Sequence, residues 1–159
     1  MARLVLLSRT VLVGAALGLA ACSLLQPSSP KTETASGIAF EASLSGRDEV
    51  PPANSRTATG TARLEYDKAR QLVSWDVKFS NLTSAATAAH IHGPADPSSN
   101  AGVVLTLPPR NMFPIVSPLQ GSATVTDAQA ADLMAGKWYV NIHTARNPNG
   151  EIRGQLIAK

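Results

Sequence analysis

The chain of 159 residues contains a single cysteine, Cys22, and only three histidines. One cysteine cannot form an internal disulfide, so a small fold held by disulfides is excluded. The sequence also has no Gly-rich phosphate-binding loop, and no serine or cysteine nucleophile has a convincing general base. These absences argue against the common nucleotide-dependent and nucleophile-based enzymes, although they leave enzymatic activity open.

The excess of basic residues is small and is concentrated near the start of the sequence. There are 14 Lys and Arg against 11 Asp and Glu, for a formal net charge of +3. Without Arg3 and Arg9 the excess falls to about +1. No basic cluster interleaved with aromatic residues remains, so we expect no nucleic-acid partner.

Residues 1–21 have the pattern of a lipoprotein signal peptide. Arg3 and Arg9 give a positive start, and the run from Val11 to Leu19 is apolar. The ending Leu19-Ala20-Ala21-Cys22 resembles a bacterial lipobox, which implies cleavage before Cys22 and attachment of acyl chains such as palmitate. The alternative is an uncleaved anchor, but a spanning helix needs about 20 apolar residues. We therefore expect an extracytoplasmic protein that faces the periplasm or the cell surface. Lipid on Cys22 would anchor it to its partner, the membrane.

The rest of the sequence divides into a tether and one domain. Residues 22–37 are rich in Ser, Pro and Thr, which is typical of a flexible linker. Residues 38–159 number roughly 120, enough for one domain with its own apolar core.

The pattern of this domain is all-β. Apolar and polar residues alternate most clearly from Leu72 to Phe79, as in a half-buried strand. Further strands are expected at 38–44, 57–66, 86–91, 103–107, 121–125, 138–143 and 151–158. Turn-forming segments between them, such as Asp67–Arg70 and Asn147–Gly150, favour a single antiparallel β-sandwich with Greek-key-like topology.

One short helix is predicted near residues 127–135. Thr126 and Gln129 have the spacing of a capping box, and Gly136 follows as a stop signal. We expect Leu133 and Met134 to pack this helix against the sheet, and Trp75 and Trp138 to lie in the core.

The three histidines occur in two strand segments. His90 and His92 are two residues apart, so their imidazoles project from the same face of a strand. His143 alternates with the apolar Ile142, which places it on the polar side of its own strand. If the two strands are neighbours, these residues predict a three-histidine metal site. The alternative is that the histidines only hydrogen-bond backbone or loops.

Three imidazole nitrogens with an open position suit copper or a catalytic zinc ion. We favour copper, with zinc as the second choice, because the expected compartment is oxidising. Met112 could add a soft ligand, or it could simply pack in a loop. Residues around metal ligands normally orient them, and the candidates for this role are Glu49, Asn141, Glu151 and Arg153. Arg153 could guide an anion to the metal or form an ion pair with a carboxylate, and we favour the ion pair.

Three segments of the chain resemble the CHRD domain, which is named for its occurrence in chordin. They are LSGRDEVPP at 44–52, AHIHGPA at 89–95, and YVNIHT continuing to NPNGEIRGQL at 139–156. The resemblance covers about residues 38 to 158 and implies an extracellular domain. In chordin such domains belong to a protein that binds growth factors, a role that does not suit a bacterial lipoprotein, so no activity is implied.

A more distant resemblance is to copper-zinc superoxide dismutase, also a β-sandwich. It rests on the His-x-His pair, the late histidine and the closing strand around Arg153-Gly154. The zinc ligands, the full copper set and the structural disulfide of that family are missing here. The resemblance therefore implies copper binding more than dismutase activity.

Three functional hypotheses follow from the sequence. The first is a lipid-anchored protein that binds copper through His90, His92 and His143. The second is a metal-free surface module with a protein or glycan partner. The third is a copper-only enzyme similar to superoxide dismutase. Of the two possibilities, we favour a protein without enzymatic activity.

Overall fold

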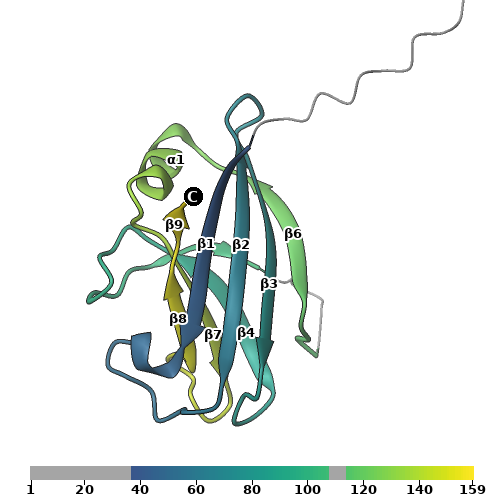
Figure 1. Cartoon of the computed structure of the whole chain (residues 1–159), viewed down its shortest axis with the longest axis vertical. Coiled ribbons are helices and arrows are strands. Elements are labelled where there is room, and N and C mark those ends of the chain that lie inside the picture. Colours follow the sequence, from purple (N-terminus) through teal and green to yellow (C-terminus); the bar gives the residue numbers. More distant parts are fainter. Residues whose placement is uncertain (1–36, 108–113) are drawn as a thin grey trace, which may run out of the picture. The chain divides into compact units, whose positions relative to one another are not determined.

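The computed structural model describes residues 37–107 and 114–159 (Figure 1). Cys22 and Met112 lie outside these residues. The elements of the described part are, in chain order, β1 (Ile38–Ser45), the 3-10 helix η1 (Gly46–Asp48), β2 (Thr59–Asp67), β3 (Leu72–Ser80), β4 (Ala86–His92), β5 (Val103–Thr106), β6 (Leu119–Thr124), α1 (Asp127–Met134), β7 (Tyr139–Thr144), β8 (Ile152–Gln155) and β9 (Ile157–Ala158).

The strands form one antiparallel sheet. Its order is β5-β4-β7-β8-β1-β2-β3-β6, and β9 pairs with β1. A bridge between Ala86 at the start of β4 and Ile115 before β6 brings the two ends of this order together. The sheet is therefore a nearly closed barrel or sandwich, and β3 and β4 follow each other in sequence without being neighbours, as in Greek-key folds. The predicted all-β class with one short helix is confirmed.

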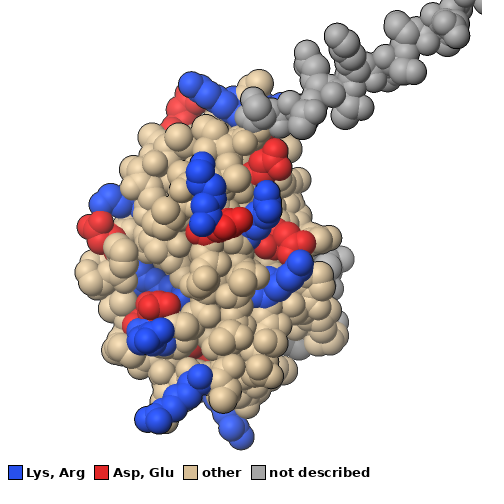
Figure 2. Space-filling model, viewed as in Figure 1, with Lys and Arg blue, Asp and Glu red and all other residues tan. Residues whose placement is uncertain are grey.

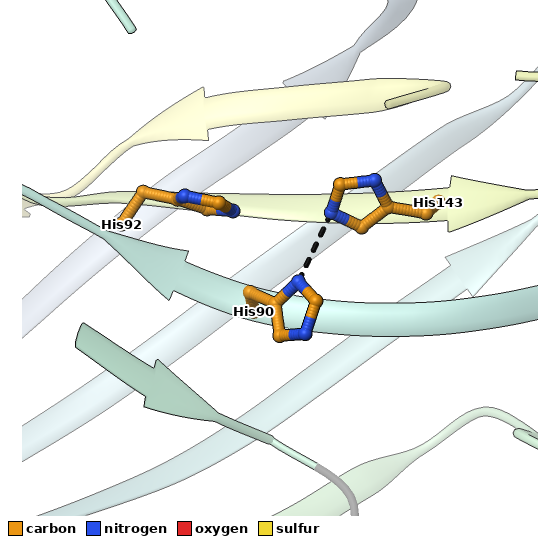
Figure 3. A group of neighbouring side chains, drawn as sticks. All are labelled: His90, His92 and His143. Carbon is orange, nitrogen blue, oxygen red and sulfur yellow. Dashed lines mark hydrogen bonds between the residues drawn. The ribbon is translucent and has the colours of Figure 1, made fainter. Parts of the chain in front are cut away.

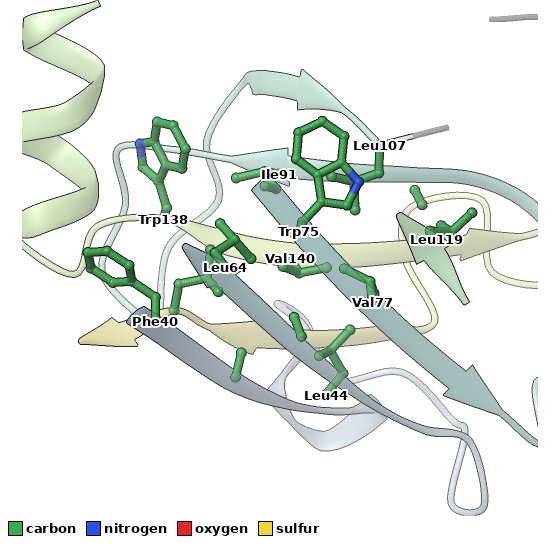
Figure 4. Close-up of a cluster of buried hydrophobic side chains, with 14 of the residues drawn as sticks. Phe40, Leu44, Leu64, Trp75, Val77, Ile91, Leu107, Leu119, Trp138 and Val140 are labelled. Carbon is green, nitrogen blue, oxygen red and sulfur yellow. The ribbon is translucent and has the colours of Figure 1, made fainter. Parts of the chain in front are cut away.

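The apolar residues of alternating strands meet inside this sheet. Trp138 is fully buried and Trp75 is 8% exposed, so both predicted core positions are confirmed. Figure 4 shows these two rings with the aliphatic side chains of strands from both halves of the sheet order, among them Leu64, Ile91 and Val140. The alternation along β2 and β3 is the direct cause, because every second side chain points inward.

Helix α1 has the predicted capping box. The hydroxyl of Thr126 accepts a hydrogen bond from the Gln129 amide, and the Gln129 side chain accepts one from the Thr126 amide. Leu133 is fully buried, but Met134 is 47% exposed. The prediction for Met134 was wrong, because Ala130 and Leu133, three residues apart, already form the buried side of this short helix. None of the helices in the described segments has the length and apolar character needed to cross a bilayer.

The closing strand differs from the prediction in extent. Instead of one strand over 151–158, the chain forms β8, which pairs with β7 and β1, and β9, which pairs with β1. The interruption falls at Leu156, whose amide donates to the Trp138 carbonyl oxygen and whose side chain is fully buried.

The strands differ in what covers their outer faces. In β2 exposed and buried residues alternate, and Figure 2 shows side chains of both charges interspersed over the face that carries β1, β2 and β3. In β7 and β8 nearly every residue is buried. Loop segments cover these two strands from outside, as hydrogen bonds from Asn141 to Glu49 and from Arg153 to Ser99 show. The histidines lie at the margin of this covered region.

Candidate metal site

Strands β4 and β7 are neighbours, as the histidine hypothesis requires. His90 lies opposite Asn141 and His92 opposite Tyr139, so His143 projects from the same face two residues further along β7. The residue opposite His143 is Ala88, next to a shift in the strand register. Its small side chain leaves the space beside His143 to the ring of His90.

The three imidazoles converge on one another (Figure 3). His90 Nδ1 and His143 Nε2 are 3.1 Å apart, and one ligand nitrogen from each histidine lies within 4.8 Å of the others. Nitrogens that share one tetrahedral zinc or copper ion lie about 3.3 Å apart, given metal–nitrogen bonds of about 2.0–2.1 Å. The cluster could therefore hold a metal ion, and the predicted convergence is confirmed.

Backbone carbonyls orient two of the imidazoles. His92 Nδ1 is 3.0 Å from the carbonyl oxygen of Ala101, and His143 Nδ1 is 2.9 Å from that of Pro148. Each Nδ1–H donates to its carbonyl, so in both rings Nε2 carries a lone pair. His92 Nε2 is buried without any hydrogen-bond partner in the described structure. An oriented, unused lone pair of this kind is what a metal ligand needs.

His90 provides the third candidate ligand atom through Nδ1, whereas His92 and His143 provide Nε2. Because His143 Nε2 carries a lone pair, His90 Nδ1 donates a proton to it when no metal is bound. Metal binding would replace this hydrogen bond, with the proton of His90 moving to Nε2. The donor atoms are then Nδ1 of His90 and Nε2 of His92 and His143.

The surroundings keep the imidazoles neutral. Burial, together with the charges that His143 and His92 would carry, lowers the pKa of His90 to about 4. Burial also lowers the pKa of His92, although its hydrogen bond to Ala101 acts the other way. Burial likewise lowers the pKa of His143. All three rings are therefore in the metal-binding form at neutral pH.

The four residues predicted to orient the ligands form no hydrogen bond with the histidines in the described structure. The orienting groups are the carbonyls of Ala101 and Pro148 instead, together with Tyr139, which was not predicted. The Tyr139 ring is stacked on His92, with ring centroids 5.0 Å apart and planes 6° from parallel. Its hydroxyl accepts a hydrogen bond from the Ala101 amide. Tyr139 and His143 are four residues apart on one strand and therefore lie on the same face. This spacing is the sequence signal from which a role of Tyr139 beside the site could have been predicted.

Arg153 contacts the site through Tyr139. Its Cζ lies 3.5 Å from the centroid of the Tyr139 ring, a cation–π contact. The expected ion pair is absent: no carboxylate of the described residues lies within 4 Å of the guanidinium, which instead donates to Asn100 Oδ1 and to the carbonyls of Asp96 and Ser99. A guanidinium has five N–H donors in a fork, which lets neutral carbonyls satisfy it.

Glu49 and Asn141 support the loop that positions His143. Asn141 Nδ2 donates to Glu49 Oε1 over 2.6 Å. A Cβ atom on Gly150 would lie 2.4 Å from Asn141 Nδ2 and 2.6 Å from Glu49 Oε1, and Gly150 has φ +134°. Only glycine allows this close approach, and the same loop provides the carbonyl of Pro148. Burial raises the pKa of Glu49 to about 7, against the opposing effect of the Arg153 charge.

Glu151 joins three loops at one end of the sheet. Its carboxylate accepts hydrogen bonds from the amide and hydroxyl of Thr83 and from the side chains of Ser55, Thr144 and Asn147. Burial alone would raise the pKa of Glu151, but the hydrogen bonds from Thr144, Thr83 and Ser55 hold it below its ordinary value. Its role is therefore to fix loops, one of which carries Pro148.

The fold and the site together define an all-β antiparallel domain with a three-histidine cluster on the outer side of two strands. The chain belongs to the CHRD domain family, whose family model matches residues 40–156. No curated protein and no solved structure matches the chain.

Proposed function

We propose that this protein is a lipid-anchored, extracytoplasmic metal-binding protein, and that copper is the metal held by His90, His92 and His143. The observation that carries the proposal is the orientation of the rings. Backbone carbonyls fix His92 and His143 so that each Nε2 carries a lone pair. The lone pair of His92 has no partner in the described structure, and that of His143 lies 3.1 Å from His90 Nδ1.

The chemistry of the donors supports copper or zinc over other metals. The cluster contains imidazole nitrogens and no carboxylate, whereas calcium and magnesium prefer oxygen ligands. Among divalent first-row metals, copper binds such nitrogen sites most tightly. Zinc is the second candidate, because it also accepts three histidines and an open position.

The membrane attachment rests on the sequence around Cys22. The apolar run ending in Leu19-Ala20-Ala21-Cys22 and the Ser- and Pro-rich segment after it support a lipid on Cys22 and a tether to the domain. The test is metabolic labelling with palmitate in a bacterial host. Label is expected on the protein and should be lost in Cys22→Ser. Equal labelling of this variant would contradict the anchor.

Metal analysis tests the site. Protein purified without a histidine tag is loaded with Cu(II) or Zn(II), desalted and analysed by elemental mass spectrometry. We expect about one equivalent of copper on the native protein and less than a tenth of that on a His90→Ala/His92→Ala variant. Thr87→Ala, an exposed position on the same strand, is the matched control and should load normally.

Two outcomes would overturn the metal site. One is less than a tenth of an equivalent on the native protein, and the other is equal loading of the double variant. Circular dichroism of each protein separates loss of ligands from loss of fold.

The alternative is a metal-free module for a protein or glycan partner. A hollow of about 700 Å³ on the outer face of β1, β2 and β3 favours it. Charged side chains of both signs line it: Glu41, Arg63, Asp76, Lys78 and Lys159. A negative metal analysis would leave this surface as the principal candidate.

A further inference from the structure

The charge of the candidate metal site is not balanced by its ligands. Three neutral imidazoles provide no negative charge, and no aspartate or glutamate of the described residues belongs to the cluster. A divalent ion bound there keeps its full charge of +2. Since isolated charges are costly in a partly buried place, something else must compensate it.

The neighbouring side chains add positive charge. Arg153 lies across the Tyr139 ring from the site, since β7 lies between β4 and β8 in the sheet. It is 1% exposed, and the groups it donates to are neutral oxygens of Asn100, Asp96 and Ser99.

The nearby acidic groups are occupied elsewhere. Asp96 pairs with Lys137, and Asp48 accepts a hydrogen bond from Ser45. Glu151 is surrounded by donors from three loops. Glu49 accepts a hydrogen bond from Asn141. None of these carboxylates hydrogen-bonds the imidazoles.

The three histidines are only partly buried, whereas the face of β7 beside them is covered. Three nitrogens leave at least one position of a four-coordinate ion unfilled. The described residues offer no fourth side chain from the group His, Cys, Asp and Glu, so this position is open to a ligand from solution.

We propose that the metal-loaded site binds a small monovalent anion at this open position. The inference rests on the proposed metal function and extends it to the class of ligand that the metal takes. A small anion neutralises part of the +2 charge, whereas a neutral ligand of similar size fills the same position without doing so. The site should therefore discriminate by charge.

The first experiment compares an anion with a neutral ligand on the copper-loaded full-length protein. Azide and ammonia are titrated separately at a pH near 8, and the Cu(II) signal is followed by electron paramagnetic resonance and absorption. Azide is expected to change both spectra. The ratio of azide affinity to free-ammonia affinity should be at least tenfold higher for the protein-bound ion than for free Cu(II), after correction for protonation of ammonia. An unchanged ratio, or no spectral change with azide, would overturn the proposal.

The second experiment supplies the missing negative charge from the protein. Thr106 is exposed on β5 and lies directly opposite His90, so their Cβ atoms are about 5 Å apart on one face. Thr106→Glu brings a carboxylate within reach of the metal, while Thr106→Gln has the same shape without charge. We expect the azide dissociation constant to rise at least tenfold in Thr106→Glu and to stay within about twofold in Thr106→Gln.

The two proposals fail in different ways. Metal stoichiometry is measured first on each protein, and loss of copper from the native protein would contradict the metal site itself. Full loading without anion binding, or equal azide affinity in Thr106→Glu and Thr106→Gln, would contradict only the anion proposal.

Discussion

On its inner face β7 places Val140 and Ile142 among apolar side chains, whereas on its outer face it places Tyr139 and Asn141 beneath loops and His143 at their margin. Apart from His143 the side chains of both faces are buried, but the physical basis of this burial differs. The inner face is held by apolar contact, which depends on volume and shape. The outer face is held by hydrogen bonds, which depend on a particular partner for each group.

This difference determines which changes each face tolerates. A volume-conserving swap inside the sheet keeps most of the contacts. On the outer face, removing one polar partner leaves the others buried and unsatisfied, and this costs more than the hydrogen bond itself contributes. The candidate metal site belongs to the outer face, so its geometry depends on loops that are fixed residue by residue.

The largest predicted effect is at Glu151, where one side chain holds three loops. Glu151→Ala leaves the donors of Ser55, Thr83, Thr144 and Asn147 without their acceptor. We expect a loss of unfolding free energy on the order of 4 kcal/mol, measured by urea denaturation.

The inner face provides the control for this prediction. Ile142→Val removes one methylene group from a fully buried side chain and should cost about 1 kcal/mol. If Glu151→Ala is no more destabilising than Ile142→Val, the distinction between the two faces does not hold.

An intermediate effect, dependent on pH, is predicted at Glu49. Burial raises its pKa from 4.5 to about 7, with Asp48 acting in the same direction and with Arg153 and Asn141 opposing. Between these values the unfolded chain loses its proton while the folded protein keeps it. The contribution of Glu49 to stability therefore falls as the pH rises through this window.

Glu49→Gln is the variant that measures this contribution. Glutamine keeps the shape of the neutral acid and does not ionise. Relative to the native protein, the variant should gain stability as the pH rises from 4.5 past 7, by up to about 3 kcal/mol. Urea denaturation across this range checks the difference, and a constant difference at all pH values would show that Glu49 ionises as freely in the folded protein as in the unfolded chain.

The smallest effect is expected where the outer face has no covering layer. Arg63 on β2 lies 3.9 Å from Glu41, and the two side chains are 72% and 43% exposed. Arg63→Ala should change the unfolding free energy by no more than about 0.5 kcal/mol, and added salt should shrink the difference further. A loss above 1 kcal/mol would mean that the open face of the sheet resembles the covered one.

The inner face and the convergence of the histidines could be predicted from the sequence, since both follow from strand alternation. Val73, Trp75 and Val77 alternate with polar residues, and the same period of two sets His90 beside His92. The capping box at Thr126 was visible because it depends on two side chains three residues apart. These features depend on residues that are close together in the chain, so the sequence alone is enough to predict them.

The outer layer could not be predicted in the same way. The groups that orient His92 and His143 are the backbone carbonyls of Ala101 and Pro148, and every residue carries such a group. The charge of Arg153 suggested a carboxylate partner, but the loops satisfy it with neutral oxygens. These contacts depend on how loops far apart in sequence fold over β7 and β8, and no spacing in the chain records that.

The position of β1 has a consequence for when the site can form. In the sheet β1 lies between β2 and the late strands β8 and β9. The first strand therefore completes its pairing only after the last strands have been synthesised. On a ribosome, His90 and His92 emerge well before β7, β8 and the loop of Pro148. A growing chain therefore carries His90 and His92 before the neighbouring strand β7 is present, and pairings between distant segments form last. The three-histidine cluster and the carbonyl that orients His143 are therefore complete only after β7 and the loop of Pro148 have been synthesised.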